Sequence, residues 1–178
     1  MRRRRASVAS AATVLLAMAA ASVAGSPATP YEPLAFLVGH CWRGNLGSSG
    51  KATDEHCFRW LYAGKFVRDE HVVHRADGQI LLSGETLYFW DAASRQLQYL
   101  YLESDGSYAR GTLESDGRAL VFPPARYVSM PDGKVQSIRS RWQRSGEDGY
   151  DVITEFQTKD GWVSGFKAHM QRTADAAS

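Results

Sequence analysis

The sequence feature that most constrains the fold is the dipeptide Asp-Gly, which occurs six times between residues 77 and 161. Aspartate and glycine both tolerate the positive φ of a type I′ turn, so Asp-Gly between alternating apolar runs is a strong hairpin signal. The six pairs are Asp77-Gly78, Asp105-Gly106, Asp116-Gly117, Asp132-Gly133, Asp148-Gly149 and Asp160-Gly161. Three more turns are expected at residues 47–50, 63–64 and 91–94. The chain is thus divided into short segments joined by tight turns.

The segments between these turns have the composition of β-strands. Residues 85–90, 97–102 and 152–156 are rich in aromatic and β-branched side chains. No segment after the N-terminal region has a sustained helical period. We therefore expect an all-β fold, an antiparallel up-and-down β-barrel of about eight to ten strands, with a two-sheet sandwich as the alternative. Sequential hairpins favour the barrel, which also removes exposed sheet edges.

Two regions qualify this pattern. The apolar residues 34–38 predict a short helical turn that plugs one end of the barrel, and Pro123-Pro124 is expected to begin an irregular link. In the last segment, Trp162 and Phe166 are expected to share the buried face with Ala168 and Met170. His169 then lies on the opposite face, toward water.

The N-terminus has the three regions of a cleaved signal peptide. Residues 2–5 are all arginine, residues 14–21 are apolar but too short to span a membrane, and residues 22–24 are small. We expect a signal peptide at 1–24, an extended lead-in at 25–33, a lipocalin-like barrel domain at 34–173 and a disordered tail at 174–178. The expected location is periplasmic or secreted. No cysteine lies directly after the cleavage region, where a lipid would be attached, so no membrane anchor is expected.

Loss of the leader changes the charge of the protein. The whole chain has 21 Lys and Arg against 19 Asp and Glu, and four of the arginines lie in the leader, so the remaining chain has a net charge of −2. Such a chain lacks the basic surface that nucleic-acid binding requires, and no nucleic-acid partner is expected.

Two cysteines in an exported chain predict one disulfide, Cys41–Cys57. A hairpin turn at residues 47–50 places these two residues directly opposite each other on adjacent strands. The closed loop of about 15 residues gives roughly 3 kcal/mol of stabilisation by chain-entropy estimates.

The segment that contains Cys41 resembles a known family. The motif Leu-Val-Gly-His-Cys-Trp-Arg-Gly at residues 37–44, with residues 63–66 and 84–91, is similar to the calycin superfamily of lipocalins and fatty-acid-binding proteins. The nearest resemblance is to bacterial lipocalin-like domains, and nitrobindin-like haem domains are more distant. The resemblance implies an antiparallel barrel whose motif tryptophan, here Trp42, faces the interior and closes one end. A nitrobindin-like site needs a histidine near the C-terminus; because His169 is expected to face water, no haem or other cofactor is expected.

Strand alternation then places the histidines. If Cys41 and Cys57 lie on one face, His40 and His56 lie with Trp42 on the other face. A turn at residues 63–64 sets His56 opposite His71, with Asp69 on the same face. These histidines could bind a metal ion through His40, His56 and His71, act as an acid–base pair, or form a satisfied polar core. Neighbouring residues in a strand point to opposite faces, so the two His-Cys pairs cannot form one zinc site.

The sequence favours a non-enzymatic protein that binds a small, largely apolar molecule in the barrel. No G-x-S-x-G hydrolase motif is present. The alternatives are a metal-binding or enzymatic barrel that uses the histidines, and a structural or interaction module with a filled core. A monomer or weak dimer is expected. The candidate ligand-lining residues are His40, Trp42, His56, Trp60, His71, Tyr88 and Tyr101.

Overall fold

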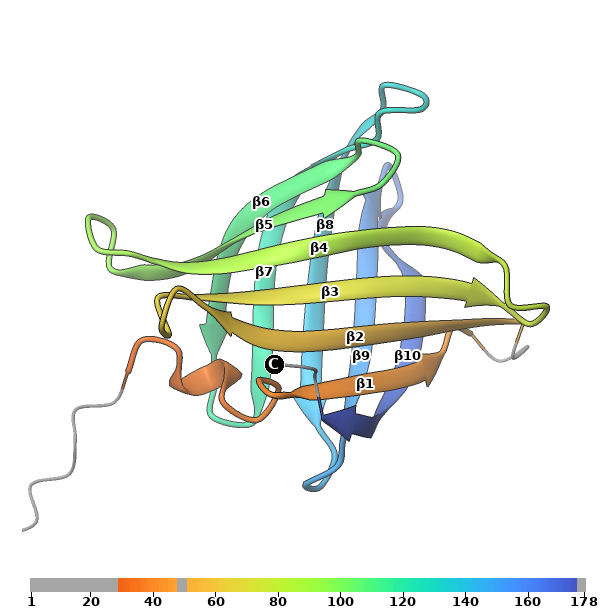
Figure 1. Cartoon of the computed structure of the whole chain (residues 1–178). Helices are drawn as coiled ribbons and strands as arrows, with labels where there is room; N and C mark the ends of the chain where they lie inside the picture. The colour runs from red at the N-terminus through yellow and green to blue at the C-terminus, as the bar shows by residue number, and fades with distance from the viewer. Residues whose placement is uncertain (1–28, 48–50, 176–178) are drawn as a thin grey trace, which may run out of the picture.

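The computed structural model describes residues 29–47 and 51–175, which form a closed barrel of ten antiparallel strands (Figure 1). The predicted signal peptide lies outside these residues, as do residues 176–178 of the expected tail. A 3-10 turn, η1 (Glu32–Leu34), precedes the first strand. The strands are β1 (His40–Asn45), β2 (Ala52–Leu61), β3 (Phe66–Arg75), β4 (Ile80–Asp91), β5 (Gln96–Glu103), β6 (Tyr108–Ser115), β7 (Ala119–Val128), β8 (Val135–Arg144), β9 (Gly149–Thr158) and β10 (Gly161–Asp175).

The strand order is that of an up-and-down barrel. Each strand from β1 to β9 pairs with the next in sequence, and β1 pairs with β10 to close the sheet. In Figure 1 the strands β1–β4 form the front wall and cross β8–β10 of the rear wall at a steep angle. The predicted fold class, an all-β antiparallel barrel of about eight to ten strands, is confirmed, and the barrel has ten strands. Among the described residues, no helix has the length and apolar character needed to cross a membrane.

All nine predicted turns fall at connections between consecutive strands, although residues 48–50 of the first turn lie outside the described residues. The Asp-Gly pairs do not form type I′ turns. Glycines such as Gly78 and Gly106 have positive φ, whereas none of the aspartates does. Instead, the aspartate side chain accepts a hydrogen bond from the backbone N–H two residues later, as Asp77 does from Gln79 at 3.0 Å. The same bond occurs at Asp105, Asp116 and Asp132. In these four turns aspartate closes an Asx turn, and the following glycine supplies the left-handed residue.

Burial alternates along the strands, as a barrel with a filled or ligand-holding interior requires. On β3, Val67, Asp69, His71 and Val73 are buried, and the residues between them are half-buried. Trp42 is fully buried and packs edge-to-face on Tyr150, with ring centroids 5.2 Å apart. Its Nε1 donates to the carbonyl of Leu37 at 3.3 Å, which ties the segment before β1 to the core.

Two expectations are corrected by β-bulges. Pro123 and Pro124 lie within β7 and do not begin a loop, because the pairing with both β6 and β8 shifts register around them. A bulge between Ser164 and Phe166 also moves Trp162 to the outer face, opposite Gln157. There the guanidinium carbon of Arg139 lies 4.3 Å from the centroid of the Trp162 ring.

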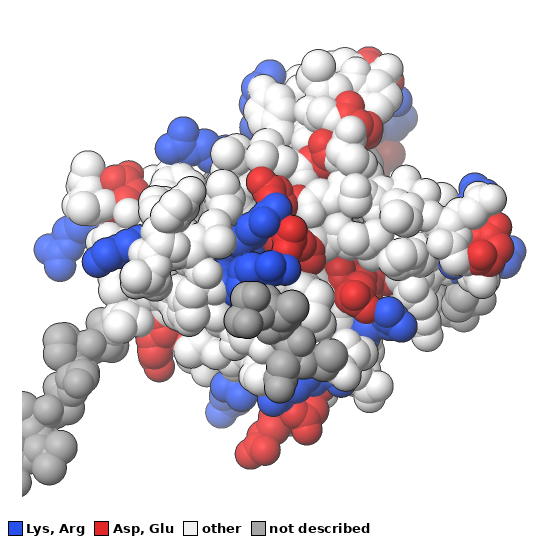
Figure 2. All heavy atoms as spheres, in the orientation of Figure 1, with Lys and Arg blue, Asp and Glu red and all other residues white. Residues whose placement is uncertain are grey.

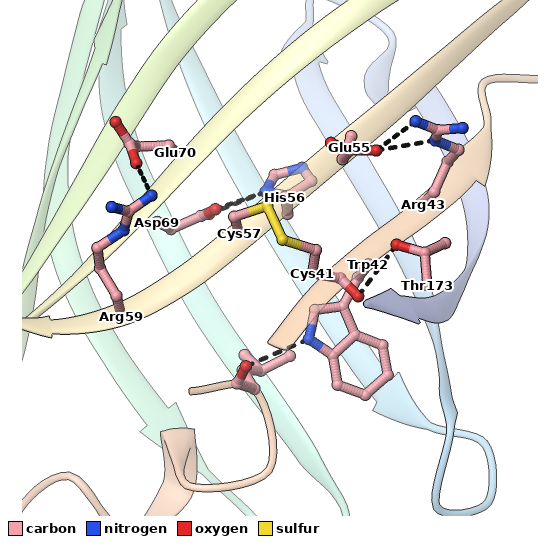
Figure 3. Close-up of a disulfide and its surroundings, with 11 residues drawn as sticks. Cys41, Trp42, Arg43, Glu55, His56, Cys57, Arg59, Asp69, Glu70 and Thr173 are labelled. Carbon is pink, nitrogen blue, oxygen red and sulfur yellow. Dashed lines mark hydrogen bonds and ion pairs between the residues drawn. A yellow bond between two sulfur atoms is a disulfide. The ribbon is translucent and has the colours of Figure 1, made fainter. Parts of the chain in front are cut away.

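The predicted disulfide joins β1 to β2. Cys41 and Cys57 are directly opposite each other, with their Cα atoms 4.1 Å apart. Figure 3 shows the bond between two ion pairs, Arg43–Glu55 and Arg59–Glu70. Acidic and basic side chains alternate over the front wall in Figure 2, so this face has no large region of a single charge.

Candidate functional site

The register of β2 and β3 brings two histidines and two aspartates together inside the barrel. His56 is opposite His71, as predicted, and their ring centroids are 5.2 Å apart in a stacked arrangement. Asp54 and Asp69 are on the same face as the histidines and are buried. We call these four residues the His–Asp cluster.

His56 lies between the two carboxylates. Its Nδ1 is 2.9 Å from Asp69 Oδ2, and its Nε2 is 3.0 Å from Asp54 Oδ2; Figure 3 shows the ring directed at Asp69. Burial alone would lower the pKa of His56, but the two carboxylates outweigh burial and raise this pKa well above its ordinary value of 6.5. His56 is therefore an imidazolium at neutral pH that donates from both nitrogens.

The same ion pairs act on Asp54. Burial raises the pKa of its carboxyl group, but the charge and hydrogen bond of His56 outweigh burial, so the pKa lies below 3.8. Asp54 is thus a carboxylate at neutral pH. Only one of its oxygens is paired: Oδ1 is buried and has no hydrogen-bond partner among the described residues.

His71 differs from His56 in charge. Burial, followed by the positive charge of His56, lowers the pKa of His71 below 6.5, so this ring is neutral at pH 7. It stacks on Tyr101, with ring centroids 5.3 Å apart, and its Nε2 is 3.4 Å from the Tyr101 hydroxyl. That hydroxyl donates to Glu103 Oε1 at 2.6 Å, and Tyr127 donates to Glu103 Oε2 at 2.8 Å.

These bonds fix the tautomer of His71. Because the Tyr101 hydroxyl hydrogen is directed at Glu103, its oxygen accepts from His71 Nε2–H. The lone pair is then on His71 Nδ1, which is buried and has no partner among the described residues.

Gly84 makes the stack of His71 on Tyr101 possible. It lies on β4, between His71 on β3 and Glu103 on β5. A Cβ at this position would lie 2.3 Å from the carbonyl oxygen of Leu102 and 2.7 Å from His71 Cε1. The missing side chain leaves the space in which the imidazole crosses β4 to reach Tyr101.

The His–Asp cluster forms part of the wall of a cavity inside the barrel. The cavity has a volume of about 380 Å³, within the range of about 300–1,000 Å³ found for small-molecule sites. All four cluster residues and Glu103 line it. The rest of the wall is mostly aliphatic and aromatic, and its rings include Tyr88, Tyr99, Tyr101, Phe122, Tyr127 and Trp142.

Four of the seven candidate ligand-lining residues lie in this wall, namely His56, His71, Tyr88 and Tyr101. Trp42 is in the core outside the cavity wall. His40 packs edge-on against Trp42, with its Nε2 3.5 Å from Arg172 Nη1, and does not line the cavity. Trp60, expected in the interior, is 44% exposed and packs on Tyr31 instead.

Sequence reasoning missed several residues of the wall. Asp54 and Glu103 are acidic residues on the inner face of predicted strands, and Phe122 and Trp142 come from strands on the far side of the barrel. The register that placed His56 inside also places Asp54 inside, two residues earlier, so that signal was present. Phe122 and Trp142 are far from β2 and β3 in the sequence, so the local register of those strands did not reveal them.

The arrangement does not form a metal site. Among residues 29–47 and 51–175, no group of three or more His, Cys, Asp and Glu side chains is placed to hold a metal ion. The structure brings His56 and His71 together but leaves His40 at the Trp42 end. In addition, both nitrogens of His56 are already bound to carboxylates.

A second hollow, of about 730 Å³, lies along β1, β9 and β10. Three of its basic side chains have acidic partners: Arg43 binds Glu55, His169 binds Asp151 at 2.7 Å, and Arg172 binds Asp148 at 2.9 Å. His169 faces water, as predicted. Because these pairs are exposed, they contribute little energy, and the interior cavity is the better candidate site.

Comparison with known proteins gives no assignment. Neither the models of known protein families nor the curated protein sequences contain a match to this chain.

Proposed function

We propose that this protein is an exported, lipocalin-like barrel of the calycin type that binds a small, largely apolar molecule in its interior. The observation that carries the proposal is the 380 Å³ cavity, whose wall combines many aromatic and aliphatic side chains with one polar cluster. Binding sites for small molecules have this composition, because apolar surface supplies affinity and a few polar groups supply orientation. The proposed function is binding without catalysis.

The segment around η1 and the disulfide between β1 and β2 both fit this proposal. Leu34 and Leu37 are fully buried next to Trp42, so the segment around η1 is suited to close one end of the barrel. The disulfide joins β1 to β2 beside this end and suits an oxidising compartment. Export through the N-terminal segment, with release as a monomer or weak dimer, is part of the proposal.

Native mass spectrometry of the full chain, expressed in a bacterium and collected from the exported fraction, tests both parts. We expect a polypeptide mass that begins at residue 25, together with a bound small molecule that is released on collisional activation. An unprocessed chain in the cytoplasm would contradict export. Exported protein that neither carries a small molecule nor takes up the neutral fluorophore N-phenyl-1-naphthylamine would contradict interior binding.

A further inference from the structure

The polar part of the cavity carries more negative than positive charge. Its wall contains the carboxylates of Asp54, Asp69 and Glu103 but a single imidazolium, His56. Arg139 is the only lysine or arginine in the described wall. Its guanidinium pairs with Glu155 at 2.7 Å on the outer face, and it therefore does not offset these acids. The lining thus has an excess of about two negative charges.

Two buried acceptor atoms in this wall are unpaired. Asp54 is 6% exposed and His71 is 3% exposed, and neither Asp54 Oδ1 nor His71 Nδ1 has a hydrogen-bond partner among the described residues. Both atoms accept, since one is a carboxylate oxygen and the other is the lone-pair nitrogen of the tautomer fixed by Tyr101. Buried polar atoms are almost always paired in folded proteins. Both residues line the cavity, so a molecule bound there can supply the missing donor.

Aromatic rings of the cavity wall lie beside both histidines of the His–Asp cluster. Trp142 is edge-on to His56 with ring centroids 6.0 Å apart, and Tyr101 stacks on His71. The faces of such rings attract cations. Phe122 is 4.9 Å from Trp142, centroid to centroid, and continues this aromatic wall.

We propose that the ligand is an amphipathic amine, with its protonated nitrogen donating to Asp54 and His71 and its apolar body against Phe122 and Trp142. This inference rests on the proposed function, and it adds the chemical class of the ligand. An ammonium group supplies up to three donors and one positive charge, which matches two unpaired acceptors in a negatively charged wall. A carboxylate or phosphate ligand would meet Asp54 and Glu103 with the same charge.

The test compares three molecules that differ only in the polar group: 2-phenylethylamine, 2-phenylethanol and phenylacetate. Each competes at pH 7 with N-phenyl-1-naphthylamine for the full chain with its disulfide intact. We expect the amine to bind at least about 10-fold more tightly than the alcohol, and the carboxylate to bind most weakly. Equal affinity of the amine and the alcohol would overturn the inference.

Asp54→Asn should bring the ratio of amine affinity to alcohol affinity close to one. Asp151→Asn is the matched control, because Asp151 also pairs with a histidine but lies on the outer face. His71→Phe keeps an aromatic ring in the stack and removes the acceptor nitrogen, so it should also reduce the preference for the amine. This variant provides the test if Asp54→Asn does not fold. A preference that survives in the inner-face variants contradicts the inference.

The outcomes separate this inference from the proposed function. If the alcohol displaces the fluorophore as well as the amine does, the amine is not the preferred class of ligand, but the cavity is still an apolar binding site. Failure of the fluorophore itself to bind would overturn both.

Discussion

At the scale of single residues, His56 has the most unusual environment in the barrel. Two carboxylates bind its two nitrogens, and a second histidine stacks on its ring. A buried ion pair of this kind adds little net stability relative to apolar residues, but the loss of one partner leaves the others uncompensated. The cluster is therefore sensitive to changes that its outward-facing neighbours would tolerate.

His56→Gln should lower the free energy of unfolding by about 3–5 kcal/mol at pH 6, since Asp54 and Asp69 then repel each other without a cation between them. The folded-state pKa of His56 is raised, so its contribution is fully present below pH 6.5 and is lost as pH rises through the higher folded-state pKa. The difference between wild type and variant should therefore shrink at alkaline pH. Urea unfolding measured at several pH values checks this.

His169→Gln is the matched control, because His169 pairs with Asp151 at 2.7 Å on the exposed outer face. Its effect should stay below about 1 kcal/mol at every pH. If His56→Gln were no more destabilising than His169→Gln, the buried ion pairs described for His56 would be refuted.

Gly84→Ala tests the contact that connects His71 to Tyr101. The added Cβ would lie 2.3 Å from the Leu102 carbonyl oxygen, so the backbone or the imidazole must move. We expect a loss of about 1–3 kcal/mol in the free energy of unfolding, measured by urea unfolding. Ser83→Ala, the neighbouring residue on β4, should change this free energy by less than about 0.5 kcal/mol. A neutral Gly84→Ala would show that the stack does not need the missing side chain.

At the scale of strands, the disulfide strengthens the shortest strand of the barrel. β1 has six residues and pairs with both β2 and β10, so it completes the closed sheet. Replacing Cys41 and Cys57 together by serine should lower the free energy of unfolding by about 3 kcal/mol, the chain-entropy value for a loop of this length. Urea unfolding of the double variant and of reduced wild type should agree. A difference from oxidised wild type below about 0.5 kcal/mol would contradict this role.

The sequence predicted the strand connections well because turn chemistry is local. Asp77 and Gly78 form their turn from their own side chain and backbone, whatever the rest of the chain does. The registers of β1 with β2 and of β2 with β3 followed from those turns. The bulges at Pro123-Pro124 and before Phe166 were not predicted, because they depend on neighbouring strands, and the bulge before Phe166 reversed the face of Trp162.

At the scale of the whole molecule, the candidate site was only partly predictable. The local registers placed His56, His71 and Asp69 together, but whether the barrel is filled depends on side chains from the far wall. Trp142 contacts His56 across the barrel, and Phe122 packs on Trp142, because the sheet closes through β1 and β10. Alternation along β2 places Trp60 on the inner face, but Trp60 lies near the end of the strand and is 44% exposed. The sequence of one strand does not show which of its inner-face residues line the cavity.

The central claim is that a small, largely apolar molecule binds inside the barrel, and the direct measurement is the dissociation constant of N-phenyl-1-naphthylamine for cavity-filling variants. Ala109 and Ala168 are buried and line the cavity, whereas Arg110, next to Ala109, is exposed. We predict that Ala109→Phe and Ala168→Phe each weaken binding at least about 10-fold, and that Arg110→Phe leaves it unchanged. Folded inner-face variants that bind the fluorophore as tightly as wild type would contradict the claim.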